Sequence, residues 1–181
     1  MYYCLHCLTG YEDSVSHEIE RLFRLGGFRD ALVWFPKKVC RIRGNGKPRE
    51  EHRPLYPGYL FISFDEDDEL FPFFDIRRLK NVIRFLSYSD GTCYLRGGDL
   101  SVARWIHRFD GDIAISKVVY KPGEKLKIID GPMQGMDGLV KKVDRHHKKI
   151  WIDFGLDGLL GNVSFDVDFL DGGGASKVLT E

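Results

Sequence analysis

The spacing of apolar residues changes several times along the first half of the chain. Tyr2–Leu8 (YYCLHCL) is apolar and aromatic and ends at Thr9-Gly10, which is typical of a strand. From Tyr11 to about Leu25, apolar residues recur at helical spacing, with acidic residues at the start and two glycines at the end. Strand character returns over Ala31–Arg43, where Pro36 predicts a bend or an edge position.

The pattern continues to alternate between strand and helix up to about residue 110. We expect a polar hairpin tip, a strongly β-forming strand, a short helix, a short strand and a second amphipathic helix, at Gly44–Pro54, Tyr56–Phe64, Leu70–Arg78, Val82–Leu86 and Leu100–Phe109. This order, with its hairpin signals, predicts an α+β fold: an α/β sandwich with an antiparallel sheet over residues 1–110.

Beyond residue 110 the helical period disappears. Residues 111–121 are typical of a linker, and residues 172–181 have no periodic pattern and predict a flexible tail. Between them, glycine-rich turns separate five short strands, which predicts a small SH3-like β-barrel over residues 122–171. The expected strands are Lys125–Ile129, Gly138–Val143, Lys149–Phe154, Asn162–Phe165 and Phe169–Leu170.

Composition narrows the class of protein. The chain has 181 residues, 43% of them hydrophobic, and its 27 Lys and Arg balance its 27 Asp and Glu. This neutrality argues against a protein that coats nucleic acid, although a local basic patch is still compatible with binding it. The longest apolar runs are far shorter than the roughly 20 residues that span a bilayer, and no signal peptide is evident. We therefore expect a cytoplasmic monomer that makes no membrane contact.

The sequence contains only weak signals for a catalytic site or a metal site. Cys4, His6 and Cys7 form a CxxC segment, but no second pair follows at zinc-finger spacing, and on a strand Cys7 faces away from the other two. No serine–histidine, phosphate-loop or paired-carboxylate arrangement stands out. The sequence therefore predicts a non-enzymatic protein without a metal or cofactor, whose four cysteines are reduced.

Two motifs carry a family resemblance. The segment Pro122–Val140, PGEKLKIIDGPMQGMDGLV, predicts a tightly turned β-hairpin, and as a string it resembles the KOW motif. Upstream, Arg53–Phe64 (RPLYPGYLFISF) and Lys80–Leu86 (KNVIRFL) resemble strands of the N-terminal domain of NusG proteins, the NGN domain. The chain thus resembles the NusG family over most of residues 2–170, with an NGN domain followed by a KOW barrel.

This resemblance implies a protein that binds RNA polymerase. In the family, an apolar patch around the PGY strand contacts the clamp helices of the largest polymerase subunit, and the matching positions here are Tyr11, Tyr56, Pro57, Tyr59 and Phe61. Tyr59 and Phe61 are two apart, so a strand places them on one face. That face either belongs to the core or is available to a partner, and the resemblance favours the available face.

Basic residues suggest contacts with DNA. One group follows a strand and its hairpin tip and includes Lys37, Lys38, Arg41 and Arg43, where a solvated hairpin is the alternative. His17, Arg21 and Arg24 lie on one face of the first helix, where relatives such as RfaH read the non-template strand. The helix Leu70–Arg78 approaches the polymerase in relatives, but its three phenylalanines depart from their polar pattern.

A second basic group surrounds a turn between two barrel strands. Its members are Lys141, Lys142, Arg145, His146, His147, Lys148 and Lys149. Such a turn is able to straddle an RNA backbone, and it resembles that of LoaP, a specialised paralogue associated with a nascent RNA hairpin. A solubilising turn is the alternative.

These features predict an antitermination factor of the LoaP or RfaH type, LoaP favoured, that suppresses pausing or termination. A general NusG whose barrel binds Rho or a small-subunit ribosomal protein is the nearest alternative. A ribosome-associated KOW protein that binds RNA is the alternative of another class.

Overall fold

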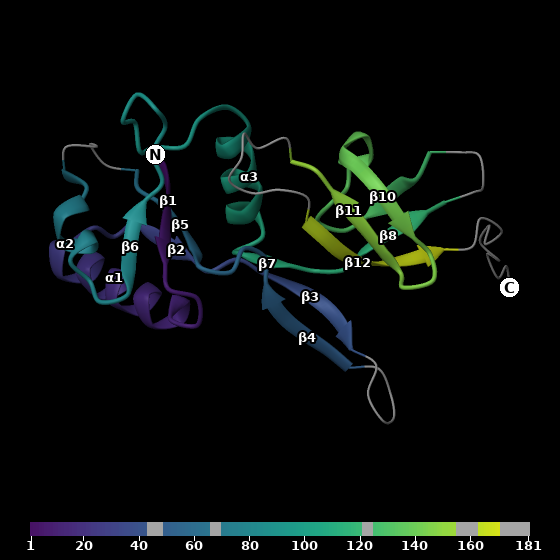
Figure 1. Cartoon of the computed structure of the whole chain (residues 1–181), viewed down its shortest axis with the longest axis horizontal. Helices are drawn as coiled ribbons and strands as arrows, with labels where there is room; N and C mark the ends of the chain where they lie inside the picture. The colour runs from purple at the N-terminus through teal and green to yellow at the C-terminus, as the bar shows by residue number, and fades with distance from the viewer. Residues whose placement is uncertain (43–48, 66–69, 121–124, 155–162, 171–181) are drawn as a thin grey trace, which may run out of the picture. The chain divides into compact units, whose positions relative to one another are not determined.

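The chain folds into two compact units (Figure 1). A computed structural model describes residues 1–42, 49–65, 70–120, 125–154 and 163–170. The first unit consists of Met1–Lys37 and Arg53–Ile113, and the second of Lys38–His52 and Ala114–Glu181. Lys38–His52 was expected in the first domain, so the observed units do not follow the predicted boundary at residue 110. The predicted tail, residues 172–181, lies outside the described residues.

The first unit is built on a four-stranded antiparallel sheet with the order β2-β5-β1-β6. Its strands are β1 (Tyr2–Cys7), β2 (Leu32–Trp34), β5 (Tyr59–Ser63) and β6 (Val82–Phe85). The helices that accompany them are α1 (Glu12–Gly26), α2 (Phe73–Arg77) and α3 (Gly97–Arg108). The predicted α+β architecture with an antiparallel sheet is confirmed.

One face of this sheet forms the core with α1 and α2. Alternate residues of β1, namely Tyr3, Leu5 and Cys7, are fully buried there, as are Leu60 and Ile62 of β5. The helix α1 contributes a row at helical spacing to the same cluster: Val15, Ile19 and Phe23. The helix ends where Gly27 takes a left-handed conformation (φ 77°), which glycine adopts without steric cost.

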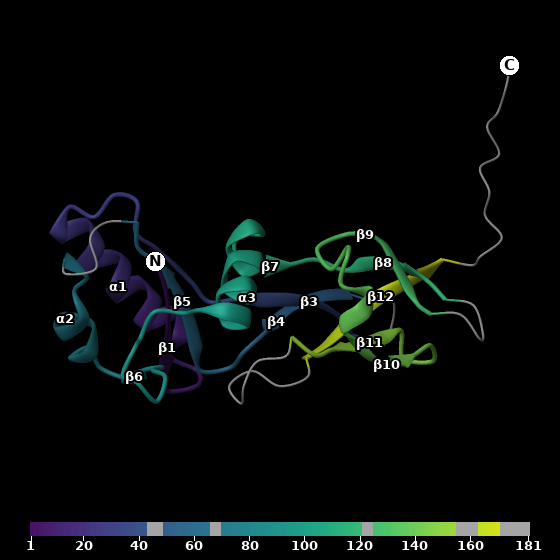
Figure 2. The ribbon, with the colours of Figure 1, turned by 90° about the horizontal axis from the view of Figure 1, so that it is seen from above.

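The other face of the sheet carries the intervening residues of β1 and β5 and contacts α3. The His107 ring of α3 lies 4.3 Å from that of Trp34 between ring centroids, and its Nδ1 is 2.6 Å from the Tyr2 hydroxyl. Figure 2 shows α3 on the side of the sheet away from α1. Tyr59 and Phe61 belong to this second face, because they pair with His6 and Cys4 of β1. The prediction that they share a face is confirmed.

The second unit contains a five-stranded barrel sheet with the order β10-β11-β12-β8-β9. Its strands are β8 (Ser116–Val119), β9 (Lys127–Asp130), β10 (Val140–Asp144), β11 (Lys149–Ile152) and β12 (Val163–Leu170). Its apolar interior includes Ile128, Met133, Ile150, Ile152 and Val167. The predicted C-terminal β domain is confirmed.

Two details of the barrel differ from the sequence prediction. Ser116–Val119 was assigned to the linker, but it forms β8, which pairs in parallel with the end of β12 and antiparallel with β9. Asn162–Phe165 and Phe169–Leu170 were expected to be separate strands, whereas β12 continues without a break from Val163 to Leu170. Pairing with β8 gives the second half of β12 a backbone partner, which explains both differences.

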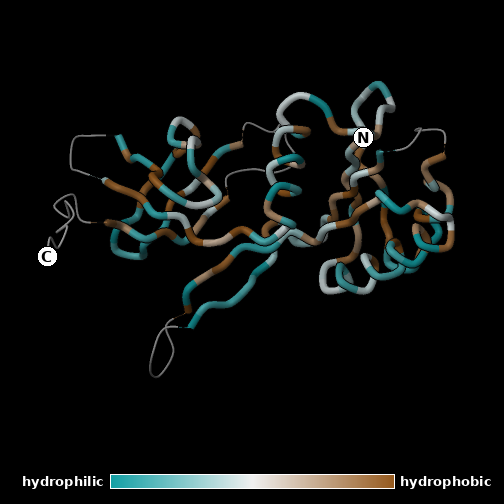
Figure 3. Tube along the Cα trace, turned by 180° about the vertical axis from the view of Figure 1, so that it is seen from behind, coloured by the Kyte–Doolittle hydropathy of each residue, from teal (hydrophilic) through white to brown (hydrophobic). Residues whose placement is uncertain are grey.

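Two further strands, β3 (Lys37–Ile42) and β4 (Arg49–Pro54), pair with each other. Pro36 separates β2 from β3, as its missing N–H predicts. Figure 3 shows that β4 is hydrophilic along its length, whereas β3 includes apolar positions. Among these, Cys40 is buried. A short strand, β7 (Asp112–Ile113), ends the first unit.

Candidate functional site

Exposed apolar side chains gather at one end of the first sheet. Leu8 is 47% exposed and Tyr11 49% exposed on the turn from β1 to α1. Pro57 is exposed on the turn that leads into β5, and Tyr59 is half-buried. The Tyr59 ring stacks on the His6 ring, with centroids 4.8 Å apart and planes 13° from parallel. We call Leu8, Tyr11, Pro57 and Tyr59 the Tyr59 surface.

The glycine of the Pro57-Gly58-Tyr59 segment brings the two turns together. The Cys7 N–H donates a hydrogen bond to the Gly58 carbonyl oxygen at 2.8 Å. Gly58 has a φ of +83°, and a Cβ there would lie 3.1 Å from the Cys7 oxygen and 3.2 Å from Thr9 Oγ1. Only glycine combines this conformation with so close an approach of the backbones. The glycine of the PGY motif is therefore required by the backbone conformation and by the close packing of the two turns.

Two of the five predicted polymerase-binding residues are not exposed. Phe61 is 1% exposed and Tyr56 6% exposed, and their ring centroids lie 6.1 Å apart. Phe61 sits within the sheet, paired with Cys4 on one side and Trp34 on the other, whereas Tyr59 begins the strand at the end of the sheet. The expectation that Phe61 and Tyr59 are equally available is wrong for this reason. Burial also raises the pKa of the Tyr56 hydroxyl above its usual range.

The cysteines of the CxxC segment are buried thiols on opposite faces of β1. Burial raises the pKa of the Cys7 thiol to about 11, and it raises that of Cys4 further. Both are thus held in the thiol form at neutral pH, which is the inert state of a structural cysteine. Within the described part of the chain, no three His, Cys, Asp or Glu side chains form a group suited to a metal ion.

Of the phenylalanines near α2, Phe71 belongs to the core and Phe73 is partly buried against it. Phe71 is 5% exposed and stacks on Tyr3, with ring centroids 4.2 Å apart, and Phe73 packs edge-on against both. Only Phe74 is exposed, at 66%, with the Arg78 guanidinium 4.3 Å from its ring centroid. The departure of this helix from the polar family pattern therefore largely reflects packing. The helix begins after Pro72, a residue favoured near helix starts.

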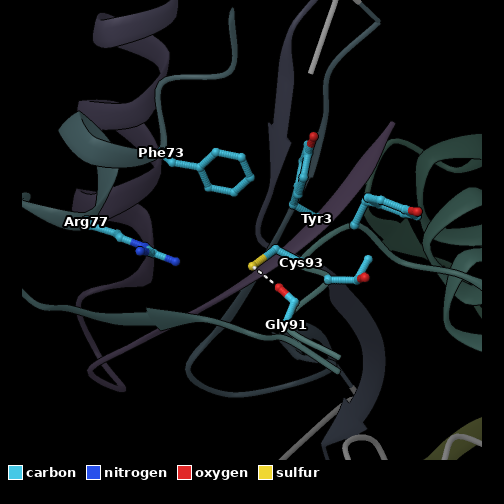
Figure 4. A pocket seen from close by; sticks show the side chains of 7 residues that line it. Tyr3, Phe73, Arg77, Gly91 and Cys93 are labelled. Carbon is cyan, nitrogen blue, oxygen red and sulfur yellow. Dashed lines mark hydrogen bonds between the residues drawn. The ribbon is translucent and has the colours of Figure 1, made fainter. Parts of the chain in front are cut away.

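A cavity of about 400 Å³ lies beside this cluster (Figure 4). Phe73 and Arg77 extend from α2 toward it, and Tyr3 forms part of its wall. On the opposite side, the Cys93 thiol donates to the Gly91 carbonyl oxygen at 3.7 Å. Its lining includes the aromatic residues Tyr3, Phe73 and Tyr94, with Arg77 as its cation. The walls of this cavity come from segments that are distant along the chain, so the sequence pattern does not predict it.

The DNA-binding candidates of α1 form a continuous exposed row. His17, Arg21 and Arg24 are all exposed and are spaced by four and three residues, so they share one helix face. The Arg21 Nε lies 3.9 Å from a carboxylate oxygen of Glu18, an exposed pair of little energetic weight. This face is accessible to a phosphate backbone.

The candidates on β3 are engaged within the molecule. Lys37 Nζ lies 3.1 Å from Asp13 Oδ1, and Lys38 Nζ donates to the Ser164 carbonyl oxygen at 2.6 Å. Arg41 binds Asp168 through both of its terminal nitrogens, with Nη2 2.9 Å from Oδ2. Its backbone N–H donates to Asp166 Oδ2 at 2.6 Å. These cations already have acceptors, which favours a structural role. Arg43 lies outside the described residues.

Breaking the Arg41–Asp168 pair is expected to destabilise the second unit modestly. The hydrogen bonds from Arg41 hold the pKa of Asp168 below its usual range. The stabilisation from this pair is therefore present above the ordinary pKa of aspartate and is lost as the pH falls through the lowered pKa. Asp168→Asn should lower the free energy of unfolding by about 1 kcal/mol at pH 7, because the pair is a third exposed and screened. Denaturant titrations at pH 7 and pH 3 measure this, and an equal difference at both pH values would contradict it.

The basic residues of the barrel gather around the turn between β10 and β11, as the sequence predicts. Several already have partners: Lys141 Nζ lies 3.7 Å from Asp153, and Lys149 Nζ 3.4 Å from Asp166. His147 binds Asp144 through both its backbone N–H and its ring, and the backbone bond is the largest cause of the lowered pKa of Asp144. All seven are exposed except Lys149, which is half-buried.

Aromatic side chains lie near this turn, which the run of basic residues alone does not predict. Lys142 pairs with Trp151 across the two strands, and its Nζ lies 4.6 Å from the Trp151 ring centroid. The Arg145 guanidinium lies 5.8 Å from the ring centroid of Tyr120 and 6.0 Å from that of Phe169. Alternation in Lys149–Ile152 (KIWI) places Trp151 on the face of Lys149, outside the barrel, and this was the available signal.

Comparison with known proteins decides the family. The family model described as the transcription termination factor NusG matches residues 1–99, more than half of the chain. The chain belongs to the NusG family. NusG-family proteins are transcription termination and antitermination factors, not enzymes.

Relatives and a solved structure agree over nearly the whole chain. The transcription termination/antitermination protein NusG of Helicobacter pylori is 26% identical over 161 residues, covering 87% of this chain and 89% of its own length. That of Escherichia coli K12 is 24% identical and covers 91% and 92%. A structure titled "Domain interaction in Thermotoga maritima NusG" matches with a TM-score of 0.55, 25% identity and coverage of 91% and 92%.

These comparisons support the NusG family and leave the specialised LoaP or RfaH type as a prediction. The matches to the Escherichia coli protein and to the Thermotoga maritima structure each cover 91% of the chain, so they include parts of both units. None of the helices in the described part of the chain has the length and apolar character that crossing a bilayer requires.

Proposed function

We propose that this NusG-family protein binds the clamp helices of the largest subunit of RNA polymerase through the Tyr59 surface and suppresses pausing or termination. The observation that carries the proposal is an aromatic pair at one end of the sheet of an NGN-type fold, the exposed Tyr11 and the half-buried Tyr59. Rigid aromatic side chains supply large contact areas at low entropy cost and dominate protein interfaces. Pro57 and Leu8 extend the same apolar contact.

The mechanism is a shift of population. A clamp that closes on nucleic acid favours elongation, and a factor shifts this equilibrium only by binding the closed state more tightly. The exposed row His17, Arg21 and Arg24 is suited to contact non-template DNA in such a complex. For Lys37, Lys38 and Arg41, the internal partners weigh against this role.

The KOW barrel would recruit a second ligand, for which nascent RNA is the favoured candidate. Around the β10–β11 turn, Lys142 and Arg145 lie over Trp151, Tyr120 and Phe169, and this mixture of cations and aromatic rings suits phosphates and unpaired bases. An RNA hairpin, as for a specialised paralogue of the LoaP type, presents both. Rho or a small-subunit ribosomal protein is the alternative ligand, corresponding to a general NusG.

The proposed function is tested with purified polymerase on templates that carry a terminator, with and without a leader that encodes an RNA hairpin. Readthrough should rise when the protein is added, and it should rise more on the leader with the hairpin. An equal effect on both templates would support the general NusG alternative. No binding to polymerase and no change in readthrough would contradict the proposal and favour a ribosome-associated protein.

Charge reversal at the barrel turn tests the RNA ligand. Lys142→Glu with Lys148→Glu should weaken binding of the full chain to leader RNA by about tenfold to a hundredfold, because each change removes a cation and adds a repelling charge. The variant Lys80→Glu with Lys127→Glu carries the same charge change at other exposed positions and serves as the control. Equal RNA affinity of the two variants in a salt titration would exclude this turn as the RNA site.

A further inference from the structure

A buried carboxylate ties together the two turns of the Tyr59 surface. Glu12 is the first residue of α1 and is only 4% exposed. Its Oε2 accepts a hydrogen bond from the Gly10 N–H at 2.6 Å, and its Oε1 accepts one from the Gly58 N–H at 2.8 Å. One donor belongs to the turn before Tyr11 and the other to the turn before Tyr59. The two oxygens of one side chain therefore link segments that are 48 positions apart at Gly10 and Gly58.

The helix itself does not require this arrangement. An acidic residue in the first turn stabilises a helix through its dipole without being buried, and the neighbouring Asp13, with 67% of its side chain exposed, already supplies such a charge. The residue before the helix, Tyr11, makes no capping hydrogen bond through its side chain. Glu12 nevertheless directs both oxygens to the turns rather than to the free N–H groups of the helix. The orientation of the Glu12 side chain is therefore explained by its hydrogen bonds to the two turns.

The backbone of Gly58 is held through both its N–H and its carbonyl group. Glu12 accepts from its N–H, and the Cys7 N–H donates to its carbonyl oxygen. Hydrogen bonds to an ionised carboxylate are shorter and stronger than neutral ones, and buried backbone N–H groups need an acceptor. The turn that precedes Tyr59 is thus joined to the turn that precedes Tyr11 through the Glu12 side chain.

We infer that Glu12 is a positioning residue for polymerase binding, which it supports without touching the polymerase. This inference rests on the proposed function of the Tyr59 surface. Loss of the Glu12 link would let the two turns separate, so the aromatic pair would have to be ordered during binding, at a cost in affinity. Loss of the link should leave the sheet and its core unchanged, because Glu12 contacts the turns and the core is formed by residues of the strands β1 and β5.

Glu12→Gln in the full chain tests this role. The amide of glutamine keeps the size of the side chain, but its NH2 group faces one of the two N–H donors, so one hydrogen bond is lost. We expect polymerase affinity to fall by about tenfold, and amide hydrogen exchange at Gly10 and Gly58 to accelerate by about as much. Glu18→Gln removes the same charge from an exposed position of α1 and should change affinity by less than about twofold.

Glu12→Asp separates reach from charge. Aspartate keeps the negative charge at the start of the helix but is one methylene shorter, so it does not reach both turns. If the length of the side chain is required, this variant should lose affinity for polymerase as Glu12→Gln does. Full affinity of the Glu12→Asp variant for polymerase would contradict the inference. Combining Glu12→Gln with Tyr59→Ala should cost less than the sum of the separate losses, because both act on the same contact.

The outcomes are distinguishable. A folded Glu12→Gln variant that binds polymerase as tightly as the unchanged protein overturns the inference and leaves the proposed function intact. Loss of the folded state in both Glu12 variants would assign Glu12 to global stability and also overturn the inference. If the unchanged protein itself does not bind polymerase, the proposed function fails, and the inference fails with it.

Discussion

Replacing both Tyr11 and Tyr59 with alanine is expected to weaken binding to RNA polymerase by about a hundredfold or more while the protein remains folded. Tyr11 lies on one of two adjoining turns and Tyr59 follows the other, so both rings would be covered together in a complex. Aromatic anchors of this kind account for much of the binding energy at protein interfaces. Since Tyr11 is half exposed and Tyr59 begins its strand, neither ring belongs to the main core cluster.

The measurement is a titration of polymerase with labelled protein, accompanied by circular dichroism to verify the fold. Tyr94→Ala provides a matched control, because Tyr94 is also an exposed tyrosine, 42% accessible, outside the Tyr59 surface. It should bind within about threefold of the unchanged protein, as expected for a residue outside the interface. Full-strength binding by the folded double variant would mean that polymerase is contacted elsewhere.

The second large effect concerns stability. Phe71→Ala should lower the free energy of unfolding by about 3–5 kcal/mol, because it leaves a cavity where a buried aromatic ring was packed. The Phe71 ring contacts Tyr3 at 4.2 Å, Phe73 at 4.5 Å and Phe64 at 5.1 Å between centroids. This cluster joins the segment before α2 to the sheet, so its loss should loosen both.

Denaturant unfolding of Phe71→Ala and Phe74→Ala measures this effect with an internal comparison. The Phe74 side chain is 66% exposed, so its removal should change the free energy of unfolding by no more than about 0.5 kcal/mol. Similar losses for the two variants would contradict the assignment of Phe71 to the core and Phe74 to the surface.

The sequence predicted the sheet faces well, because alternation is a local property of a strand. In Tyr56–Phe64, alternate residues divide between the core with α1 and the opposite face, as the register of β5 with β1 shows. The helices α1 and α3 were located from apolar spacing, with ends that shifted by one to three residues. Pro36 marked the break between β2 and β3. Each of these features depends on neighbours along the chain.

Burial and charge pairing were not predictable in the same way. The difference between Tyr59 and Phe61 depends on how far each lies from the end of the sheet, which alternation does not encode. Arg41 meets Asp168, a partner 127 positions away, so its basic segment had the same sequence signature as a surface able to bind phosphates. Similarly, the role of Glu12 became visible only when the Gly58 turn was placed beside the Gly10 turn.

The cation–aromatic contacts of the barrel likewise depend on strand pairing and were not predictable from local sequence. Trp151 was visible as an outward residue of a short strand, but its contact with Lys142 depends on the register between β10 and β11. Tyr120 was assigned to the linker, and its approach to Arg145 depends on the barrel that the flanking strands form. A count of basic residues therefore identified the turn but not the rings that accompany it.

The most direct test of the central claim is site-specific crosslinking to RNA polymerase. A photoreactive benzoylphenylalanine is placed at Tyr11, and in a second protein at Leu25, which is 74% exposed near the other end of α1, roughly 20 Å away. After irradiation, crosslinked peptides are identified by mass spectrometry. We predict that position 11 crosslinks to the clamp helices of the largest subunit and that position 25 does not. Crosslinks from position 25 but not from position 11, or none at the clamp helices, would contradict the proposed docking.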